Sequence, residues 1–414
     1  MSNTPAAWIG IDWADREHAV CLREADSDRR EPSVLKHSPE TIDEWAACLR
    51  KRFGGRPVAI CLEQSKGALI YALLKYDFLV LYPINPAQLA HYRKAMTQSG
   101  AKDDPTDAEL LMDYLWHFHA RMHTWKPDDE ATRLIRVLVE QRRQAIALRT
   151  QLSNRLRSRL KCYFPQALEL VGEDLGSTMA CDFLQRWPDL ATLKRARTAT
   201  LREFYHAHNC RGQERINQRI ETIRQAKPLT KDPALIEAGV REVHLLVAML
   251  RELIQPIADY DERIAQLMEV HEDAPIFRSF PGAGAALAPR LLAAFGTDRD
   301  AIDSAQTVQT WSGIAPVTRR SGKFCTVHRR WSCPKFVRQT FHEFASHSIG
   351  SSDWAQAYYQ QQRQRGKRHH AAVRALAFKW IRILYRCWKT HTPYDEDIYV
   401  AALRNKTSPL VTTL

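Results

Sequence analysis

The sequence predicts an α/β domain at the amino end, long helices in the middle and a mainly α domain at the carboxy end. Three observations predict this order. Short apolar runs alternate with amphipathic segments over 1–125, leucines recur at helical spacing within 126–275, and a glycine-rich turn followed by helical segments opens 276–414. A chain of 414 residues is too long for one compact core, so we expect three domains with these boundaries.

The charge balance indicates a polyanionic partner. Sixty Lys and Arg residues against 47 Asp and Glu residues give a formal charge of +13, which is typical of proteins that bind nucleic acid. The nine cysteines are scattered and never spaced C-x-x-C, which favours a reducing cytoplasm with neither a disulfide framework nor a zinc ribbon. No apolar run reaches the ~18 residues of a membrane helix, so we expect a soluble protein without a membrane partner.

The first region contains the elements of one α/β domain. In chain order they are strands at 7–13, 17–23 and 33–37, a helix over 39–53, strand 57–62, helix 67–76, strand 78–84 and helices near 86–95 and 104–119. The short polar turns between the first three strands suit an antiparallel meander. Three early strands followed by alternating helices and strands match the ribonuclease H-like order, which is the fold we predict.

Acidic residues lie where these elements begin or end. Asp12 stands in an apolar strand, where an unpaired carboxylate would be costly, and Glu63 follows the strand that ends at Leu62. Asp104 and Asp107 lie three apart at a helix start, so we expect them to share a face and point the same way. Such carboxylates are the ligands that Mg²⁺ or Mn²⁺ prefers, and together they predict a nuclease site. The alternative for Asp104 is that it only caps its helix.

The middle region contains two long helices. Over 133–161 the only acid is Glu140, and a leucine stripe marks one face, so we expect the other faces to contact phosphate. The arginines that we assign to nucleic-acid binding are Arg142, Arg143, Arg149, Arg155 and Arg159. From 243 to 267 apolar residues alternate at spacings of three and four, which predicts a coiled-coil seam that pairs with the first helix or with another protomer.

A basic insert of about 171–235 separates these helices. Within it, 182–230 interleaves arginines with Trp187, Phe204 and Tyr205. Aromatic side chains beside arginine suit single-stranded or looped RNA, whose bases are free to stack. A small packed helical subdomain is the alternative.

The last region opens with a glycine turn. Pro281-Gly282-Ala283-Gly284 has the pattern of a helix-hairpin-helix, in which Gly282 and Gly284 let backbone N–H groups approach a phosphate. Further on, Ser321 stands between the cations Arg320 and Lys323, a setting that suits a serine in contact with phosphate. An ordinary turn is the alternative for this serine.

Five motifs taken in order carry a family resemblance. They are Gly10-Ile11-Asp12, Cys61-Leu62-Glu63, Lys102-Asp103-Asp104-Pro105-Thr106-Asp107-Ala108, Pro281-Gly282-Ala283-Gly284 and Arg320-Ser321-Gly322-Lys323. Over nearly its whole length the chain resembles the DEDD transposases, insertion-sequence recombinases related to the Piv DNA invertases. The resemblance implies a RuvC-like domain in which Asp12, Glu63, Asp104 and Asp107 bind Mg²⁺ or Mn²⁺. It also implies a transposase domain with Ser321 as the nucleophile.

One motif departs from the family pattern. The usual form is Lys-Thr-Asp, whereas here Asp103 precedes Asp104. Either of these two acids is therefore the metal ligand.

The resemblance also implies partners. They are donor and target DNA, a structured noncoding bridge RNA that guides the choice of both, and further copies of the chain in a homodimer or tetramer with composite active sites. The seam from 243 to 267 would offer a dimerisation surface, and the location would be the nucleoid in a bacterial cytoplasm. Two alternatives stay open: a structure-selective nuclease or Holliday-junction resolvase that uses water as nucleophile, and a non-catalytic nucleic-acid scaffold.

Overall fold

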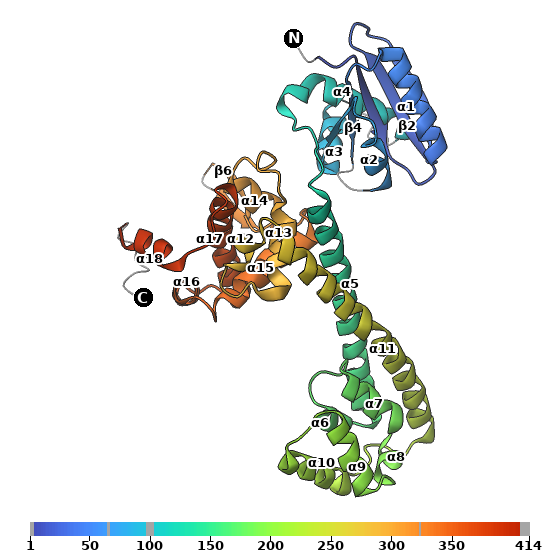
Figure 1. Cartoon of the computed structure of the whole chain (residues 1–414), viewed down its shortest axis with the longest axis vertical. Helices are drawn as coiled ribbons and strands as arrows, with labels where there is room; N and C mark the ends of the chain where they lie inside the picture. The colour runs from blue at the N-terminus through green and yellow to red at the C-terminus, as the bar shows by residue number, and fades with distance from the viewer. Residues whose placement is uncertain (1–3, 64–66, 97–102, 323, 406–414) are drawn as a thin grey trace. The chain divides into compact units, whose positions relative to one another are not determined.

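The computed structural model describes residues 4–63, 67–96, 103–322 and 324–405, and the chain divides between Pro127 and Asp128 into two units (Figure 1). The second unit contains both the middle and the carboxy-terminal regions of the sequence. Its two long helices supply side chains to two separate apolar cores, one at each end, which ties these regions together.

The first unit is built on a mixed sheet of five strands. They are β1 (Ala7–Asp12), β2 (Glu17–Glu24), β3 (Arg30–Lys36), β4 (Val58–Leu62) and β5 (Leu79–Pro83), in the order β3-β2-β1-β4-β5. The first three strands form the antiparallel meander, and β4 and β5 are parallel to β1. This is the predicted ribonuclease H-like arrangement. The strand β3 begins earlier than predicted, because its ladder with β2 extends to the pair Arg23 and Arg30.

Helices cover both faces of this sheet. They are α1 (Pro39–Phe53), α2 (Ala68–Leu73), α3 (Pro86–Met96) and α4 (Asp104–Phe118), with the 3₁₀ turn η1 (His119–Arg121) after α4. Side chains of a strand point alternately to its two faces, and β1 follows this rule. Ile9 and Ile11 pack in the core beneath α1 and α2, whereas Trp8 packs in the core beneath α3 and α4.

The second unit is organised around a helical hairpin of α5 (Glu130–Tyr163) and α11 (Pro233–Val270). The two helices run antiparallel, since Val139 near the start of α5 packs with Ile264, and Leu156 near its end packs with Val243. The predicted seam is therefore filled by α5 of the same chain. Leu246 and its seam neighbours are buried in this contact, so the expectation that they form a dimerisation surface is corrected.

The insert between these helices is a packed helical subdomain. Its helices are α6 (Ala167–Val171), α7 (Thr178–Arg186), α8 (Leu190–Lys194), α9 (Thr198–Ala207) and α10 (Gln213–Gln225). Trp187, Phe204 and Tyr205 are buried in its core and pack against one another or against Phe183. These rings are thus unavailable for stacking on RNA bases, and the alternative of a packed subdomain is correct.

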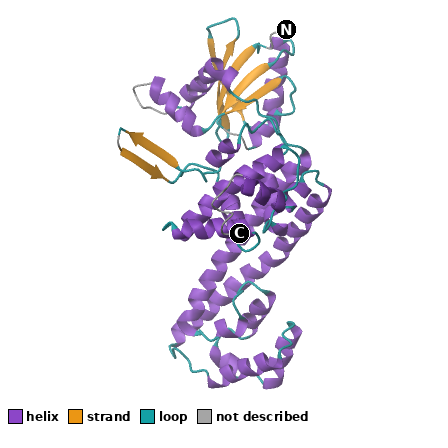
Figure 2. Ribbon diagram, turned by 90° about the vertical axis from the view of Figure 1, so that its left-hand side faces the viewer, coloured by secondary structure: helices purple, strands orange, loops and turns teal. Residues whose placement is uncertain are grey.

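The carboxy-terminal region is mainly helical, as predicted. Its elements are α12 (Ala274–Arg278), α13 (Gly284–Phe295), α14 (Ala305–Trp311), β6 (Val317–Ser321), β7 (Phe324–His328), α15 (Lys335–Ser348), α16 (Asp353–Gln364), α17 (His369–Lys389) and α18 (Glu396–Asn405). Trp354, Trp380 and Trp388 are fully buried in its core. The turn between α12 and α13 forms the predicted helix-hairpin-helix. The β6–β7 hairpin was not predicted, and Figure 2 shows it projecting from the helices of its unit.

Among the helices of the described ranges, none is both long enough and apolar enough to cross a membrane.

Candidate functional site

Two of the predicted acids lie at the ends of neighbouring strands. β1 and β4 are parallel, and their register pairs Ile11 with Leu62, so Asp12 and Glu63 follow side by side at the carboxyl edge of the sheet. Both acids are half-buried. Burial first, and the charge of Glu63 second, raise the pKa of the Cys61 thiol. The structure thus brings this pair of acids together.

The packing of α4 on β1 brings Asp104 to the same edge. Gly10 lies directly beneath α4: a Cβ atom there would collide with the carbonyl oxygen of Ala108 and the backbone nitrogen of Met112. At the other end of the contact, the ring of Trp8 is 4.5 Å from the ring of His119, which follows α4. The helix therefore runs antiparallel to β1. Its first turn, which contains Asp104, consequently lies toward the end of the strand at Asp12.

Asp107 is placed differently from Asp104. Its side chain is buried, and its two carboxylate oxygens accept hydrogen bonds of 2.7 and 2.5 Å from Arg93 of α3. Asp104, three residues earlier, is exposed. Three residues turn a helix by about 300°, and the remaining offset of about 60° is enough to bury Asp107 against α3 while Asp104 stays exposed. That the two acids point toward one site stays a prediction.

Asp103 and Asp104, either of which was predicted as the metal ligand, lie at the start of α4. Asp103 occupies the N-cap position, although its side chain makes no capping hydrogen bond, and Asp104 is the first residue of the helix. Both side chains are exposed. Asp104 is therefore not the capping residue, and both Asp103 and Asp104 present an exposed carboxylate at the start of α4.

The donor chemistry at this edge fits a hard divalent ion. Asp12, Glu63 and Asp104 supply carboxylate oxygens, which Mg²⁺ and Mn²⁺ prefer. Within the described residues, no three His, Cys, Asp or Glu side chains lie close enough together to hold a metal ion. Asp107 could join such a site only if the Arg93 guanidinium moved away from it.

A histidine pair near the same edge was not predicted from the sequence. His18 is fully buried on β2, where its Nδ1 accepts a 3.2 Å hydrogen bond from the backbone N–H of Ala14 and its Nε2 lies 3.0 Å from Nδ1 of His37. Burial of the ring, and then the charge of His37, lower the pKa of His18 to about 4. The imidazole is thus neutral at pH 7. No sequence pattern links two histidines that are 19 residues apart.

Ser321 lies in the second unit, on the β6–β7 hairpin. It is the last residue of β6, pairs in register with Phe324, and is exposed together with its neighbour Arg320. Gly322 begins the turn with φ of +56°, a conformation that favours glycine. Lys323, the other cation that the sequence places near this serine, lies outside the described residues.

The two glycines of the helix-hairpin-helix have different surroundings. A Cβ atom on Gly282 would lie 2.9 Å from the carbonyl carbon of His347, so the close approach to α15 already explains this glycine. Gly284 opens α13, and a Cβ atom there would meet nothing within 4 Å. Nucleic-acid contact at Gly282 and Gly284 stays a prediction, and the open surroundings of Gly284 favour it there.

The arginines assigned to nucleic acid on α5 are all ion-paired within their unit. The pairs are Arg142–Asp261, Arg143–Glu140, Arg149–Asp174, Arg155–Glu242 and Arg159–Glu242. All the acids except Glu140 come from outside α5, so the sequence of the helix alone could not reveal them. Contact with phosphate by these arginines stays a prediction, but part of their charge is already neutralised.

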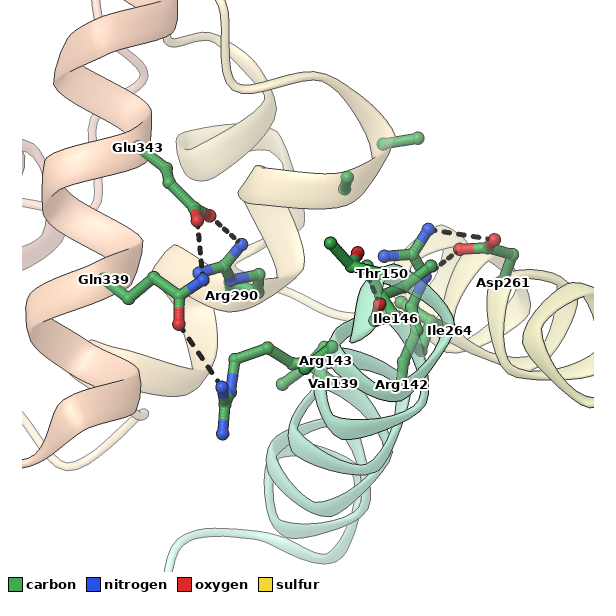
Figure 3. Close-up of a pocket in the computed structure, with 13 residues that line it drawn as sticks. Val139, Arg142, Arg143, Ile146, Thr150, Asp261, Ile264, Arg290, Gln339 and Glu343 are labelled. Atoms are coloured by element: carbon green, nitrogen blue, oxygen red, sulfur yellow. Dashed lines mark hydrogen bonds and ion pairs between the residues drawn. The ribbon is translucent and has the colours of Figure 1, made fainter. Parts of the chain in front are cut away.

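Two of these arginines also line a pocket of about 430 Å³ beside the start of α13. Figure 3 shows Arg142 directed at Asp261, and Arg143 directed at Gln339. Arg290 binds Glu343 on the opposite side of the pocket. The charges that line it are thus largely balanced.

Comparisons with known proteins agree with this geometry. A transposase family model of the DEDD IS110 type matches residues 9–165, and a model described as the IS116/IS110/IS902 transposase family matches residues 274–360. A mini-circle putative transposase for IS117 from Streptomyces coelicolor is 29% identical over 408 residues, which cover 96% of this chain and 97% of the relative. The uncharacterized 42 kDa protein of insertion element IS900 from Mycobacterium paratuberculosis is 26% identical over 398 residues. The aligned region covers 95% of this chain and 98% of that relative.

Proposed function

Because the chain belongs to the IS110 family of DEDD transposases, which cleave and transfer DNA strands, we propose that Ser321 is its nucleophile and that its carboxylates hold a divalent metal ion. The main support for the metal site is that Asp12 and Glu63 lie side by side at the ends of two parallel strands. The first turn of α4 lies at the same edge of the sheet. The exposure of Ser321 supports the proposed nucleophile, since a nucleophile must reach a phosphate.

Asp12, Glu63, Asp104 and Asp107 would hold Mg²⁺ or Mn²⁺ in this proposal. Such an ion polarises a phosphate and lowers the pKa of an attacking hydroxyl. Asp107 would contribute after Arg93 released its two oxygens. The Arg93 side chain would then bind a DNA phosphate in place of Asp107.

Ser321 would attack the scissile phosphorus through its Oγ. A serine–phosphate ester forms, the phosphodiester bond to the leaving strand breaks, and that strand takes up a proton as a free hydroxyl. The energy of the broken bond is kept in the ester, so a second hydroxyl can later displace the serine and complete strand transfer. Lys323 would offset the charge that develops on the phosphate, and Arg320 would contact DNA backbone away from the serine.

We propose donor and target DNA as the substrates and a structured noncoding bridge RNA as the guide. Base pairing between RNA and DNA would then choose the sites, while the protein grips backbone. The formal charge of +13 supports a large nucleic-acid contact. The arginines of α5 would contribute to this contact by exchanging their carboxylate partners for phosphates. Gly282 and Gly284 would contribute through their backbone N–H groups.

The serine step is tested by a covalent adduct. The natural protein with its RNA and a labelled DNA substrate should give a protein–DNA band on a denaturing gel. Ser321→Ala should abolish this band, and Asp12→Asn should lower strand cleavage about a thousandfold, which corresponds to ~4 kcal/mol. Ser332→Ala, a matched change in the same region, should leave the band intact. Efficient cleavage without an adduct would favour a nuclease that uses water, and recombination at full rate after removal of all RNA would exclude guidance.

The same variants test composite active sites. We propose that a homodimer or tetramer combines Ser321 of one chain with the carboxylates of another. A mixture of Asp12→Asn and Ser321→Ala proteins then contains heterodimers in which one site carries both lesions and the other site is whole. Partial recovery of the adduct supports the arrangement, whereas a mixture that stays inactive after demonstrated subunit exchange contradicts it.

A further inference from the structure

The β6–β7 hairpin is a two-stranded ribbon with large apolar side chains in solvent. Phe324 is 71% exposed and Val327 is 63% exposed. Isolated two-stranded ribbons are at best marginally stable in water, and large exposed apolar side chains commonly mark a binding surface. The ribbon therefore has the features of an element that is completed by a partner.

The register divides the ribbon into two faces. Arg319 pairs with Thr326, and Ser321 pairs with Phe324. Because side chains alternate along a strand and paired residues share a face, Arg319, Ser321, Phe324, Thr326 and His328 all lie on one side, here called the serine face. A 3.1 Å hydrogen bond between His328 Nε2 and Thr326 Oγ1 agrees with this division. Arg320 and Val327 lie on the opposite side.

This division separates two arginines that are adjacent in sequence. Arg320 directly precedes Ser321 in the chain but points to the other side of the ribbon. Arg319, two residues before the serine, lies on its side at a distance of ~7 Å along the strand. Phe324 lies directly across from the serine, where paired Cβ atoms are about 5 Å apart. The immediate neighbours of the hydroxyl are thus one cation and one aromatic ring.

We propose that the serine face lies against the DNA strand that is cut, with Phe324 stacked on a base beside the scissile phosphate and Arg319 in contact with that phosphate. The inference rests on the proposed role of Ser321 as nucleophile. Phe324 is then a positioning residue, which fixes the nucleotide so that the phosphate meets the Ser321 hydroxyl. A two-stranded ribbon also has the dimensions that a DNA groove admits.

Charge identifies nucleic acid as the occupant. Between Asp303 and Glu343 the chain has no acidic residue, while the ribbon and the segment after it contain Arg319, Arg320, Arg329 and further cations. A phosphate backbone complements such a surface, and an aromatic side chain can stack on any base. Within the described part of the chain no aromatic ring or cation stacks on Phe324, in contrast to Trp331, which Arg329 covers at 5.0 Å.

The test compares exposed apolar residues on the two faces. Phe324→Ala should slow formation of the serine–DNA adduct by about tenfold at saturating DNA, and Phe324→Trp should restore most of the rate, since an indole also stacks. Val327→Ala removes a similarly exposed side chain from the opposite face and should change the rate less than twofold. Arg319→Gln should slow the adduct at least as much as Phe324→Ala does.

A second readout does not depend on cleavage. A DNA substrate with 2-aminopurine next to the scissile phosphate should lose fluorescence on binding to the Ser321→Ala protein. The added change Phe324→Ala should restore that fluorescence, and Val327→Ala should not. Unchanged adduct rate and unchanged fluorescence in Phe324→Ala overturn the inference while the role of Ser321 stands. Fluorescence loss that depends on Phe324, together with cleavage but no adduct in the natural protein, overturns the serine mechanism instead.

A further outcome concerns a second copy of the chain as the occupant. If Phe324→Ala lowered the oligomeric state in sedimentation experiments and left the fluorescence signal unchanged, the serine face would be a contact between copies, and DNA stacking would be overturned.

Discussion

The carboxylate edge of the sheet and the serine ribbon are built in opposite ways, and one glycine in each illustrates the contrast. A Cβ atom on Gly10 would collide with the backbone of α4, whereas a Cβ atom on Gly322 would meet nothing within 4 Å. The metal site that we propose at the sheet edge needs several oxygens at fixed positions, which tight packing supplies. The nucleophile that we propose at Ser321 needs one hydroxyl brought to one phosphate, and bound DNA would set that position. The sheet edge is therefore rigid, and the ribbon is accessible to solvent.

The largest effect should follow from filling the space at Gly10. Gly10→Val forces α4 away from β1, because the colliding atoms are backbone and cannot rotate aside. We expect a loss of about 3 kcal/mol or more in the free energy of unfolding of the first unit. Denaturant unfolding followed by tryptophan fluorescence measures it. Gly322→Asn is the matched change on the ribbon and should leave stability unaltered, since asparagine tolerates positive φ. Equal stability of the two variants would contradict the claim that Gly10 is tightly packed and Gly322 is not.

A slightly smaller effect should follow from removing the partner of Asp107. Arg93→Gln leaves a buried carboxylate without its two charged hydrogen bonds, at a cost of about 3 kcal/mol. If Asp107 can bind metal, added Mg²⁺ should recover part of this loss in Arg93→Gln. The double change of Arg93→Gln with Asp107→Asn provides the control and should gain less stability from Mg²⁺, because only Asp12, Glu63 and Asp104 remain to bind the ion. If Mg²⁺ stabilised both variants equally, Asp107 would not be a metal ligand.

The contrast between the regions also explains what the sequence could predict. The strands were predictable because apolar runs mark each of them, and their order was predictable because it matches the ribonuclease H-like order. The neutralisation of Arg155 by Glu242 depends on a tertiary contact between segments that are 87 residues apart. No window along the chain contains that information.

The seam was predicted with two possible partners, of which α5 is confirmed, and the ribbon was not predicted at all. The periodicity from 243 to 267 correctly predicted an apolar stripe but could not identify its partner, which proved to be α5 of the same chain. The β6–β7 hairpin is exposed over most of its length on both faces, so it lacks the alternation of apolar and polar residues that marks a half-buried strand. Elements that no core requires are the ones that sequence patterns predict least well.

Lowering the pH should destabilise the sheet by an intermediate amount. The pKa of His18 is about 4 in the folded protein and about 6.5 when unfolded. Below pH 6.5 the unfolded chain therefore binds a proton that the folded chain does not, and stability falls until about pH 4. Between pH 8 and pH 5 we expect a loss of about 2 kcal/mol from this group. His18→Gln should remove that part of the pH dependence, and an unchanged slope would show that the ring is not buried in its neutral form.

The smallest effect on stability should come from the ribbon. Phe324→Ser removes a large apolar side chain, a change that in a core costs ~3 kcal/mol or more. Phe324 is already 71% exposed, so little apolar surface returns to water, and we expect a change within about 0.5 kcal/mol in the free energy of unfolding. Ile9→Ser in the buried sheet is the contrasting variant and should unfold far more easily, because its side chain is fully buried. If Phe324→Ser cost more than about 1 kcal/mol, the ring would be packed within its own unit and not free to stack on DNA. Stability near that of the natural protein, combined with a slower serine–DNA adduct, would place the function of Phe324 in the DNA complex alone.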